Sequence, residues 1–223
     1  MASAEEMVTQ GEKLLTEGDY SPALVQFTSA GEQKPDLAQA FFGAGNAYLG
    51  LMQFGKAVEQ FERAGKIDPK NYLYPHKEGY AYLRKGVMKN ARQAIEQSIK
   101  LKADYAPNYY LLGQIHLLAS ENDTAMGYFE KALSLDKDYI DALLGKADTL
   151  AKMGKLEEAV SAYQQVLARD EGNINAVYRQ GRVYLKLKQF EKAKKSAERA
   201  LSLKPSWERG MMLLGEALRG LGK

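Results

Sequence analysis

The sequence predicts an all-α protein built as a stack of helix pairs. Alanine recurs at a step of 34 residues without an insertion or deletion, and glycine follows the same step in a second column that only Ala147 interrupts. An internal repeat of this length is typical of a solenoid, in which each unit packs on its neighbours. The two columns are Ala23, Ala57, Ala91, Ala125, Ala159 and Ala193, and Gly11, Gly45, Gly79, Gly113, Gly181 and Gly215.

Each alanine begins a helical pattern. Apolar residues follow most of these alanines at four and seven positions, as Phe27 and Ala30 follow Ala23. Residues at i, i+4 and i+7 lie on one face of a helix, and small ones among them let a neighbouring helix approach closely. The glycine column lies in a second helical pattern, with apolar neighbours such as Phe41 and Tyr48. We therefore expect two helices in each unit.

Turn-forming residues separate the two helices of a unit. A glycine, or a pair such as Asn122 and Asp123, falls about midway through the units, where the first helix must turn back into the second. Three units end at a proline, namely Pro35, Pro69 and Pro205.

These features resemble the tetratricopeptide repeat, a helix-turn-helix unit of 34 residues with alanine, aromatic and closing proline positions. The resemblance implies one right-handed α-solenoid over residues 1–223, with no linker. It also implies that residues 208–223 form the additional helix that caps many such arrays. Ala103, Lys137 and Glu171 depart from the closing proline. The six expected units are 4–37, 38–71, 72–105, 106–139, 140–173 and 174–207.

Charge is distributed unevenly along the chain. The net charge is +3 overall, whereas residues 174–223 carry 12 Lys and Arg against 4 Asp and Glu. We interpret this excess mainly as a solvated helix face, with an acidic protein or a lipid headgroup as the alternative partner. Nucleic acid is the weakest alternative, because no pattern of interleaved aromatic and basic residues accompanies the charge.

The sequence offers no catalytic constellation. Residues 50–57 approach the phosphate-binding loop, but Ala57 stands where that loop needs Ser or Thr. His76 and His116 share no spacing of metal ligands or of a catalytic triad. We expect His116 to pack in the apolar column and His76 to face the binding groove. We therefore predict no enzymatic activity, no cofactor and no metal.

The resemblance implies a binding site on the first helix of each unit, since these helices line the groove that holds peptides or partner helices in such arrays. Aromatic side chains there would anchor a partner, and arginine would bind its carboxylates. The alternative for the tyrosines is packing between helices. The predicted binding residues are Phe42, Asn46, His76, Lys77, Tyr80, Tyr110, Gln114, Leu144, Tyr178, Arg179, Arg182 and Lys186.

We interpret the chain as a non-enzymatic adaptor that holds a protein or peptide, acidic at one end, within a multiprotein assembly. The alternative is a self-assembling scaffold of a bacterial organelle, secretion or pilus machine. Two known modes of the family are absent, because the positions of the carboxylate clamp of co-chaperones and of the asparagine ladder do not match. No segment approaches the roughly 18 consecutive apolar residues of a membrane helix. A cytoplasmic location is expected, or a periplasmic one if a signal or flanking region was removed.

The C-terminal helix bears on the scaffold alternative. We expect Met211, Leu214 and Leu218 to pack on the preceding unit. The remaining apolar residues, Met212, Leu213 and Leu221, would then form an exposed patch through which two copies associate.

Overall fold

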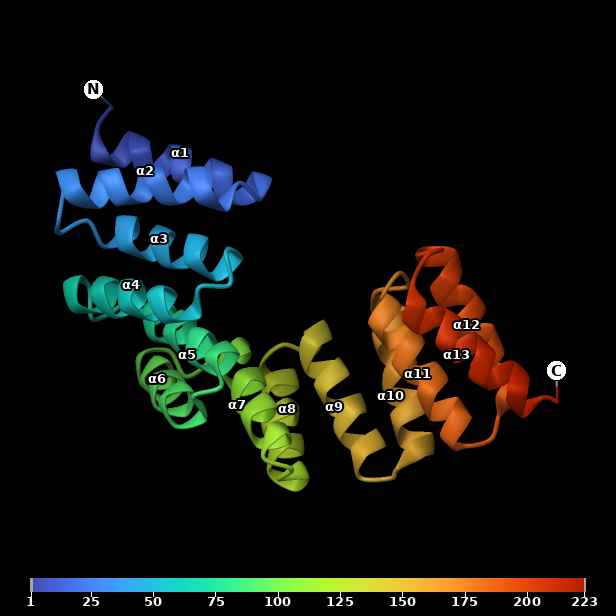
Figure 1. Cartoon of the computed structure of the whole chain (residues 1–223). Helices are drawn as coiled ribbons and strands as arrows, with labels where there is room; N and C mark the ends of the chain where they lie inside the picture. The colour runs from blue at the N-terminus through green and yellow to red at the C-terminus, as the bar shows by residue number, and fades with distance from the viewer. Residues whose placement is uncertain (1, 223) are drawn as a thin grey trace. The chain divides into compact units, whose positions relative to one another are not determined.

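The computed structural model describes residues 2–222, which form thirteen α-helices and no strand (Figure 1). Six pairs of a first and a second helix are followed by a thirteenth helix in the position of a first helix, as the repeat predicts. The first helices are α1 (Ala4–Glu17), α3 (Ala38–Gly50), α5 (Leu73–Lys85), α7 (Ala106–Leu118), α9 (Ile140–Lys152), α11 (Ile174–Lys186) and α13 (Glu208–Gly220). The second helices are α2 (Tyr20–Gln33), α4 (Phe54–Ile67), α6 (Met88–Leu101), α8 (Asn122–Leu135), α10 (Leu156–Arg169) and α12 (Phe190–Leu203).

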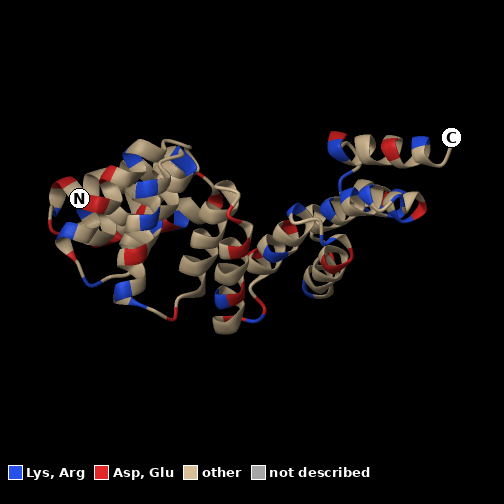
Figure 2. Cartoon of the chain, turned by 90° about the horizontal axis from the view of Figure 1, so that it is seen from below, with Lys and Arg blue, Asp and Glu red and all other residues tan. Residues whose placement is uncertain are grey.

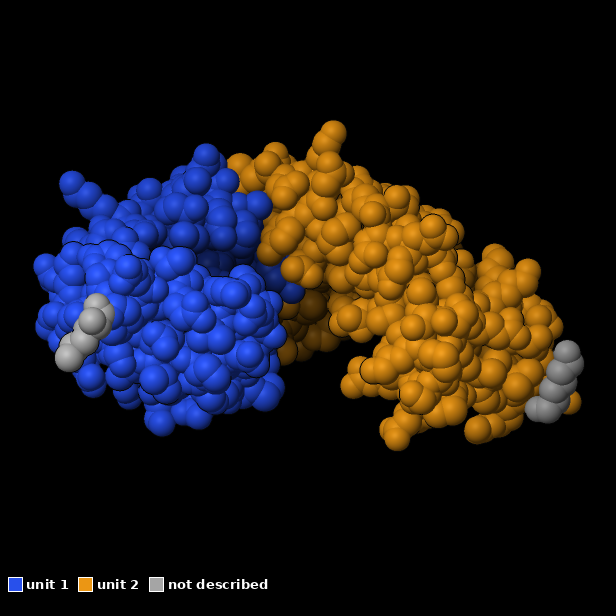
Figure 3. All heavy atoms as spheres, turned by 90° about the horizontal axis from the view of Figure 1, so that it is seen from above, with its two compact units in different colours: residues 1–111 blue, residues 112–223 orange. Residues whose placement is uncertain are grey.

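The chain divides into two compact units, coloured separately in Figure 3. Unit 1 comprises residues 1–111 and unit 2 comprises residues 112–223, and the division falls inside α7. In unit 1, helices α1 to α5 each pack against the next helix in the chain. In unit 2, helices α8 to α12 do the same. Each unit is therefore a stack of antiparallel helices in chain order.

The repeated small residues form the core of each unit. All six alanines of the alanine column are fully buried. In the first four repeats the large side chain four positions after the alanine is also buried, and it packs against glycine. A Cβ atom added to Gly113 or to Gly145 would lie 2.5 Å from the ring of Phe129. The two glycines therefore make room for one aromatic ring in unit 2, and Gly11 and Gly43 flank Phe27 in the same way in unit 1.

The turn between the helices of each pair repeats with the same step. One residue in each turn has a positive φ angle, which favours glycine because other side chains meet the backbone there. Three turns use glycine at this position, and three do not. The residues and φ angles are Gly18 (83°), Gly86 (85°), Gly154 (80°), Met52 (58°), Ser120 (63°) and Lys188 (55°).

Replacing Lys188 by glycine is expected to raise the free energy of unfolding by about 0.5–1 kcal/mol, because the strain of a side chain at positive φ disappears. The matched substitution Gly154→Lys should lower it by about 1 kcal/mol. Both positions are exposed, so packing contributes little to either change. Urea unfolding of the two variants measures the difference, and equal effects of the same sign would contradict it.

The C-terminal helix is rotated relative to our prediction. Leu213 is fully buried and packs against Gly181, whereas Met211 is 49% exposed. The prediction was wrong for these two residues, because α13 packs through Gly210, Leu213 and Ala217, one helical face away from the expected one. Met212 is 65% exposed, as predicted.

Candidate functional site

The predicted binding residues of unit 1 lie on the first helices, at positions between the fully buried ones. Asn46 on α3 and Lys77 and Tyr80 on α5 are half-buried. Burial lowers the pKa of Lys77. The hydroxyl of Tyr80 accepts a hydrogen bond of 2.8 Å from Arg84 Nη1. These three residues present an amide, an amine and an aromatic ring at the surface of unit 1.

His76 is not part of that surface. Its side chain is 7% exposed, and its Nδ1 lies 2.9 Å from Oδ1 of the fully buried Asn108. Asn108 donates in turn to the hydroxyl of Ser98, which donates to the carbonyl of Tyr72. Burial lowers the pKa of His76 to about 4. The side chain is therefore neutral near pH 7 and belongs to a buried polar chain, contrary to the expectation that it faces a groove.

Several other predicted residues take part in packing. The ring of Phe42 lies 5.8 Å from that of Phe61 and 5.2 Å from that of Tyr74. Leu144 packs against the core of unit 2. Tyr110 and Gln114 are half-buried. His116, which we expected to pack, is buried and its ring stacks on Tyr128 at 5.1 Å.

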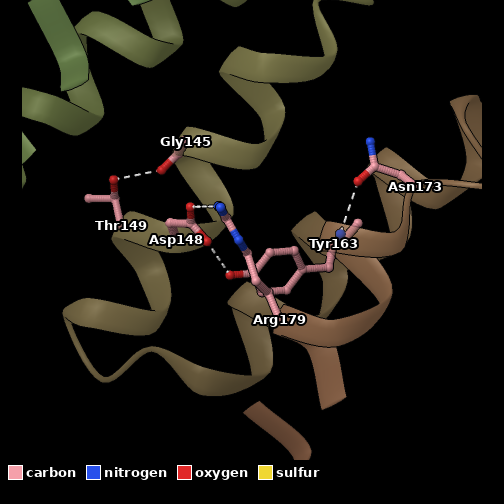
Figure 4. Close-up of polar contacts among 7 residues, drawn as sticks. Gly145, Asp148, Thr149, Tyr163, Asn173 and Arg179 are labelled. Atoms are coloured by element: carbon pink, nitrogen blue, oxygen red, sulfur yellow. Dashed lines mark hydrogen bonds and ion pairs between the residues drawn. The ribbon is translucent and has the colours of Figure 1, made fainter. Parts of the chain in front are cut away.

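A three-residue cluster joins helices α9, α10 and α11 of unit 2 (Figure 4). Asp148 on α9 is ion-paired with Arg179 on α11 and accepts a 2.6 Å hydrogen bond from the hydroxyl of Tyr163 on α10. Burial raises the pKa of Asp148, and the charge of Arg179 and the bond from Tyr163 partly offset this. Burial and the neighbouring carboxylate raise the pKa of Tyr163. The guanidinium of Arg179 therefore neutralises a carboxylate of its own chain.

Arg182 is also paired within the chain. Its Nη1 donates to Glu216 Oε1 at 2.7 Å. The ring of Tyr178 lies edge-on to that of Trp207, with centroids 5.1 Å apart. Lys186 is exposed, and among the described residues no carboxylate lies within ion-pair distance of it. Of the three predicted cations of unit 2, Lys186 alone has no carboxylate partner in the described part of the chain.

The sequence contained a signal for one of these pairs that we did not use. Arg182 and Glu216 occupy the same position in successive repeats, so their side chains lie side by side on adjacent first helices. Opposite charges at one column position are thus close enough to pair, although Asp148, one repeat before Arg182, pairs with Arg179 instead. Asp148 and Arg179 are separated by 31 residues, and the column alone does not indicate that contact.

Among the described residues, no group of three or more His, Asp or Glu side chains could hold a metal ion. No helix within residues 2–222 has the length and apolar character needed to cross a membrane.

Family models described as tetratricopeptide repeat match residues 38–71, 76–105, 116–162 and 150–216. The chain belongs to the tetratricopeptide repeat family. It is 27% identical over 201 residues to the human protein O-mannosyl-transferase TMTC3. This match covers 87% of this chain and 19% of the human protein. The chain spans half the length or less of these curated relatives. Its matches cover 31% of a tetratricopeptide repeat protein of Methanocaldococcus jannaschii and 50% of a DnaJ homolog of Schizosaccharomyces pombe.

Solved structures share the fold. The chain matches the structure of the APC/C hetero-tetramer Cut9-Hcn1 with a TM-score of 0.87 and 20% identity, over 97% of this chain and 43% of that one. It matches PilW, a type IV pilus biogenesis factor, with a TM-score of 0.85 and 16% identity, over 95% and 98% of the two chains. At these identities the likeness shows the all-α helical repeat fold alone.

Proposed function

We propose that this tetratricopeptide repeat chain is a non-enzymatic adaptor that binds a peptide or a helix of another protein on its first helices. The observation that carries the proposal is the contrast between two columns of the repeat. The buried alanine column never changes, whereas the column of Asn46 and Tyr80 continues with a different residue in each following repeat. Its members from the second repeat onward are Asn46, Tyr80, Gln114, Asp148, Arg182 and Glu216. The alanine repeats because it packs in the core of every unit, whereas a position that faces a partner is free to vary.

The comparisons support an adaptor without naming its partner. Tetratricopeptide repeat proteins are generally non-enzymatic scaffolds, and the Cut9-Hcn1 structure is a complex of two different proteins. The transferase named in the TMTC3 match is a protein of which this chain covers only 19%. An acidic part of a partner would meet Lys186 in unit 2, because Arg179 and Arg182 are paired within the chain.

A displayed peptide library tests the binding surface of unit 1. Peptides selected on the wild-type protein should bind at least about tenfold more weakly to the variant Asn46→Ala with Tyr80→Ala, because both side chains lie at the surface and the anchor ring is lost. The control variant Glu59→Ala with Arg92→Ala changes two exposed residues of the second helices. Selected peptides that bind the Asn46 and Tyr80 variant as tightly as the wild type would place binding elsewhere.

A self-assembling scaffold is the second candidate, favoured by the open face of α13. Met211 and Met212 are exposed there, and a Cβ added to Gly215 would meet no atom within 4 Å. The other glycines of its column each pack against a side chain of a neighbouring helix.

Light scattering over a wide concentration range tests this second candidate. Oligomers that disappear in Met211→Glu with Met212→Glu would support it, because the two charges cannot be buried at an interface. A constant monomer mass would reject it. Leu213→Glu is unsuitable as a test, because Leu213 is buried inside unit 2.

A further inference from the structure

Two hollows of the surface occupy equivalent places in the two units. Each lies on the side of the second helices, bounded by one first helix, the second helix before it and the second helix after it; we call such a hollow a second-helix groove. The groove of unit 1, of about 220 Å³, is lined by Glu62, Glu78, Tyr82, Asn90, Gln93, Ala94 and Gln97. The groove of unit 2, of about 210 Å³, is lined by Leu167, Val177, Gln180, Tyr184, Lys192, Lys195, Ser196 and Arg199.

The two grooves have the same framework and opposite charge. Six lining residues of the second groove lie three repeats after their counterparts in the first. The tyrosine is kept, as Tyr82 and Tyr184. The groove of unit 1 contains two carboxylates and three amides, whereas that of unit 2 contains three cations and no carboxylate. Packing of the repeat does not require the three cations of the unit 2 groove, since the equivalent groove of unit 1 has none.

The cations of the unit 2 groove lie along one face of α12. Lys192 Nζ lies 5.6 Å from the centre of the Tyr184 ring. Arg199 Nη2 donates to the carbonyl of Glu171 at 2.7 Å, and its ion pair with the exposed carboxylate of the same residue is long, at 3.6 Å. No described carboxylate lies within ion-pair distance of Lys192 or Lys195, and both are exposed. Lys and Arg are visible along the helices near the C-terminus in Figure 2.

We propose that the second-helix groove of unit 2 binds an extended, acidic peptide segment of a partner protein. The steps from Lys192 to Lys195 and from Lys195 to Arg199 correspond to rises of about 4.5 and 6 Å along a helix. Side chains on one side of an extended peptide repeat at about 6.6 Å, so alternate carboxylates can reach successive cations. Charge-assisted hydrogen bonds would hold them there.

The floor of the groove favours a peptide over other anionic partners. Val177 is buried beneath the groove, and the half-buried Leu167 offers an apolar contact to the side chains between the carboxylates. A lipid bilayer presents a flat surface, which does not enter a groove. A nucleobase would need an open aromatic face for stacking, and Lys192 lies over the ring of Tyr184. This site is separate from the first-helix surface and does not depend on peptide binding there.

The test measures binding of a fluorescein-labelled peptide of about eight residues in which Glu and Val alternate, so that its carboxylates follow the spacing of an extended chain. The variant Lys192→Asn with Lys195→Gln copies the residues Asn90 and Gln93 of the unit 1 groove, which the same framework accommodates. We expect it to bind about tenfold more weakly at low salt, and the difference to shrink at high salt.

The control variant Lys137→Asn with Lys155→Gln removes the same charge from two exposed positions of unit 2 outside the groove. It should bind the peptide as the wild type does, and a peptide with Gln in place of Glu should not bind. An equal loss in both variants would reduce the effect to net charge and overturn the proposal. Absence of peptide binding, or tighter binding of oligothymidine or of phosphatidylserine vesicles, would overturn it as well.

Discussion

Replacing Phe129 by alanine is expected to lower the free energy of unfolding by about 3–5 kcal/mol, the usual cost of removing a fully buried phenyl ring. The ring is completely inaccessible to solvent and lies between Gly113 and Gly145. Neither glycine has a side chain that could move into the space, so a cavity should remain. Urea unfolding followed by circular dichroism measures the loss.

The reciprocal change, Gly145→Ala, should also destabilise the protein, by about 1–3 kcal/mol, because its methyl group would lie 2.5 Å from the ring. In the Phe129→Ala background the same change should be neutral or stabilising, since the space is then free and alanine favours helix over glycine. The double-mutant cycle should therefore show a coupling energy of about 2 kcal/mol.

A control for helix propensity lies on the same helix as Phe129. Gly127 is exposed on α8, and a Cβ added to it would meet no atom within 4 Å. Gly127→Ala should stabilise the protein by about 0.5–1 kcal/mol and should not couple to Phe129→Ala. If Gly145→Ala were as harmless as Gly127→Ala in the wild-type background, packing of the Phe129 ring would not require glycine at position 145.

The sequence predicted the framework because the framework repeats. The same local packing, an alanine and an aromatic ring facing glycine, is used in several units. Its recurrence in the sequence indicated both helix types and their order. The orientation of α13 was not predictable in this way. Its packing uses Leu213, at a position that carries Thr9, Gly43 and Lys77 in earlier repeats, so the column does not indicate burial.

The candidate site was less predictable, because it depends on pairwise contacts. Residue types showed that Arg179 and Arg182 add positive charge to the first helices, but not that Asp148 and Glu216 neutralise it. His76 likewise has a polar partner on another helix, Asn108, which in turn donates to Ser98 on a third helix. These contacts join different repeats. Apart from the Arg182–Glu216 pair, which shares one column position, the repeat period does not indicate which side chains meet.

The stability of unit 1 is expected to depend on pH through two residues of α5 that act in opposite directions. Burial lowers the pKa of His76 from 6.5 to about 4 in the folded state. Its neutral form stabilises the fold fully above pH 6.5, and this contribution is lost as the pH falls toward 4, by about 3 kcal/mol in total. Lys77 lies beside it and also disfavours its protonation, whereas the hydrogen bond to Asn108 favours it.

Glu78 has the opposite dependence. Burial and the carboxylate of Glu62 raise its pKa from 4.5 to about 7. Its protonated form is the stable one in the fold, so its contribution is present below pH 4.5 and is lost as the pH rises toward 7. The change should be smaller than that of His76, because Glu78 is half-buried and solvent screens its charge. Between pH 4.5 and 6.5 the two residues therefore partly cancel.

Single variants separate the two contributions. Glu78→Gln, which copies Gln180 of the equivalent groove, should stabilise the protein at pH 7 and have little effect at pH 4.5. His76→Gln should lower stability at pH 6.5 and above, and should remove the acid-side loss between pH 6.5 and 4. Urea unfolding at each pH gives both profiles. If Glu78→Gln shifted stability equally at pH 4.5 and 7, its carboxyl group would titrate normally, and the opposition between the two residues of α5 would not exist.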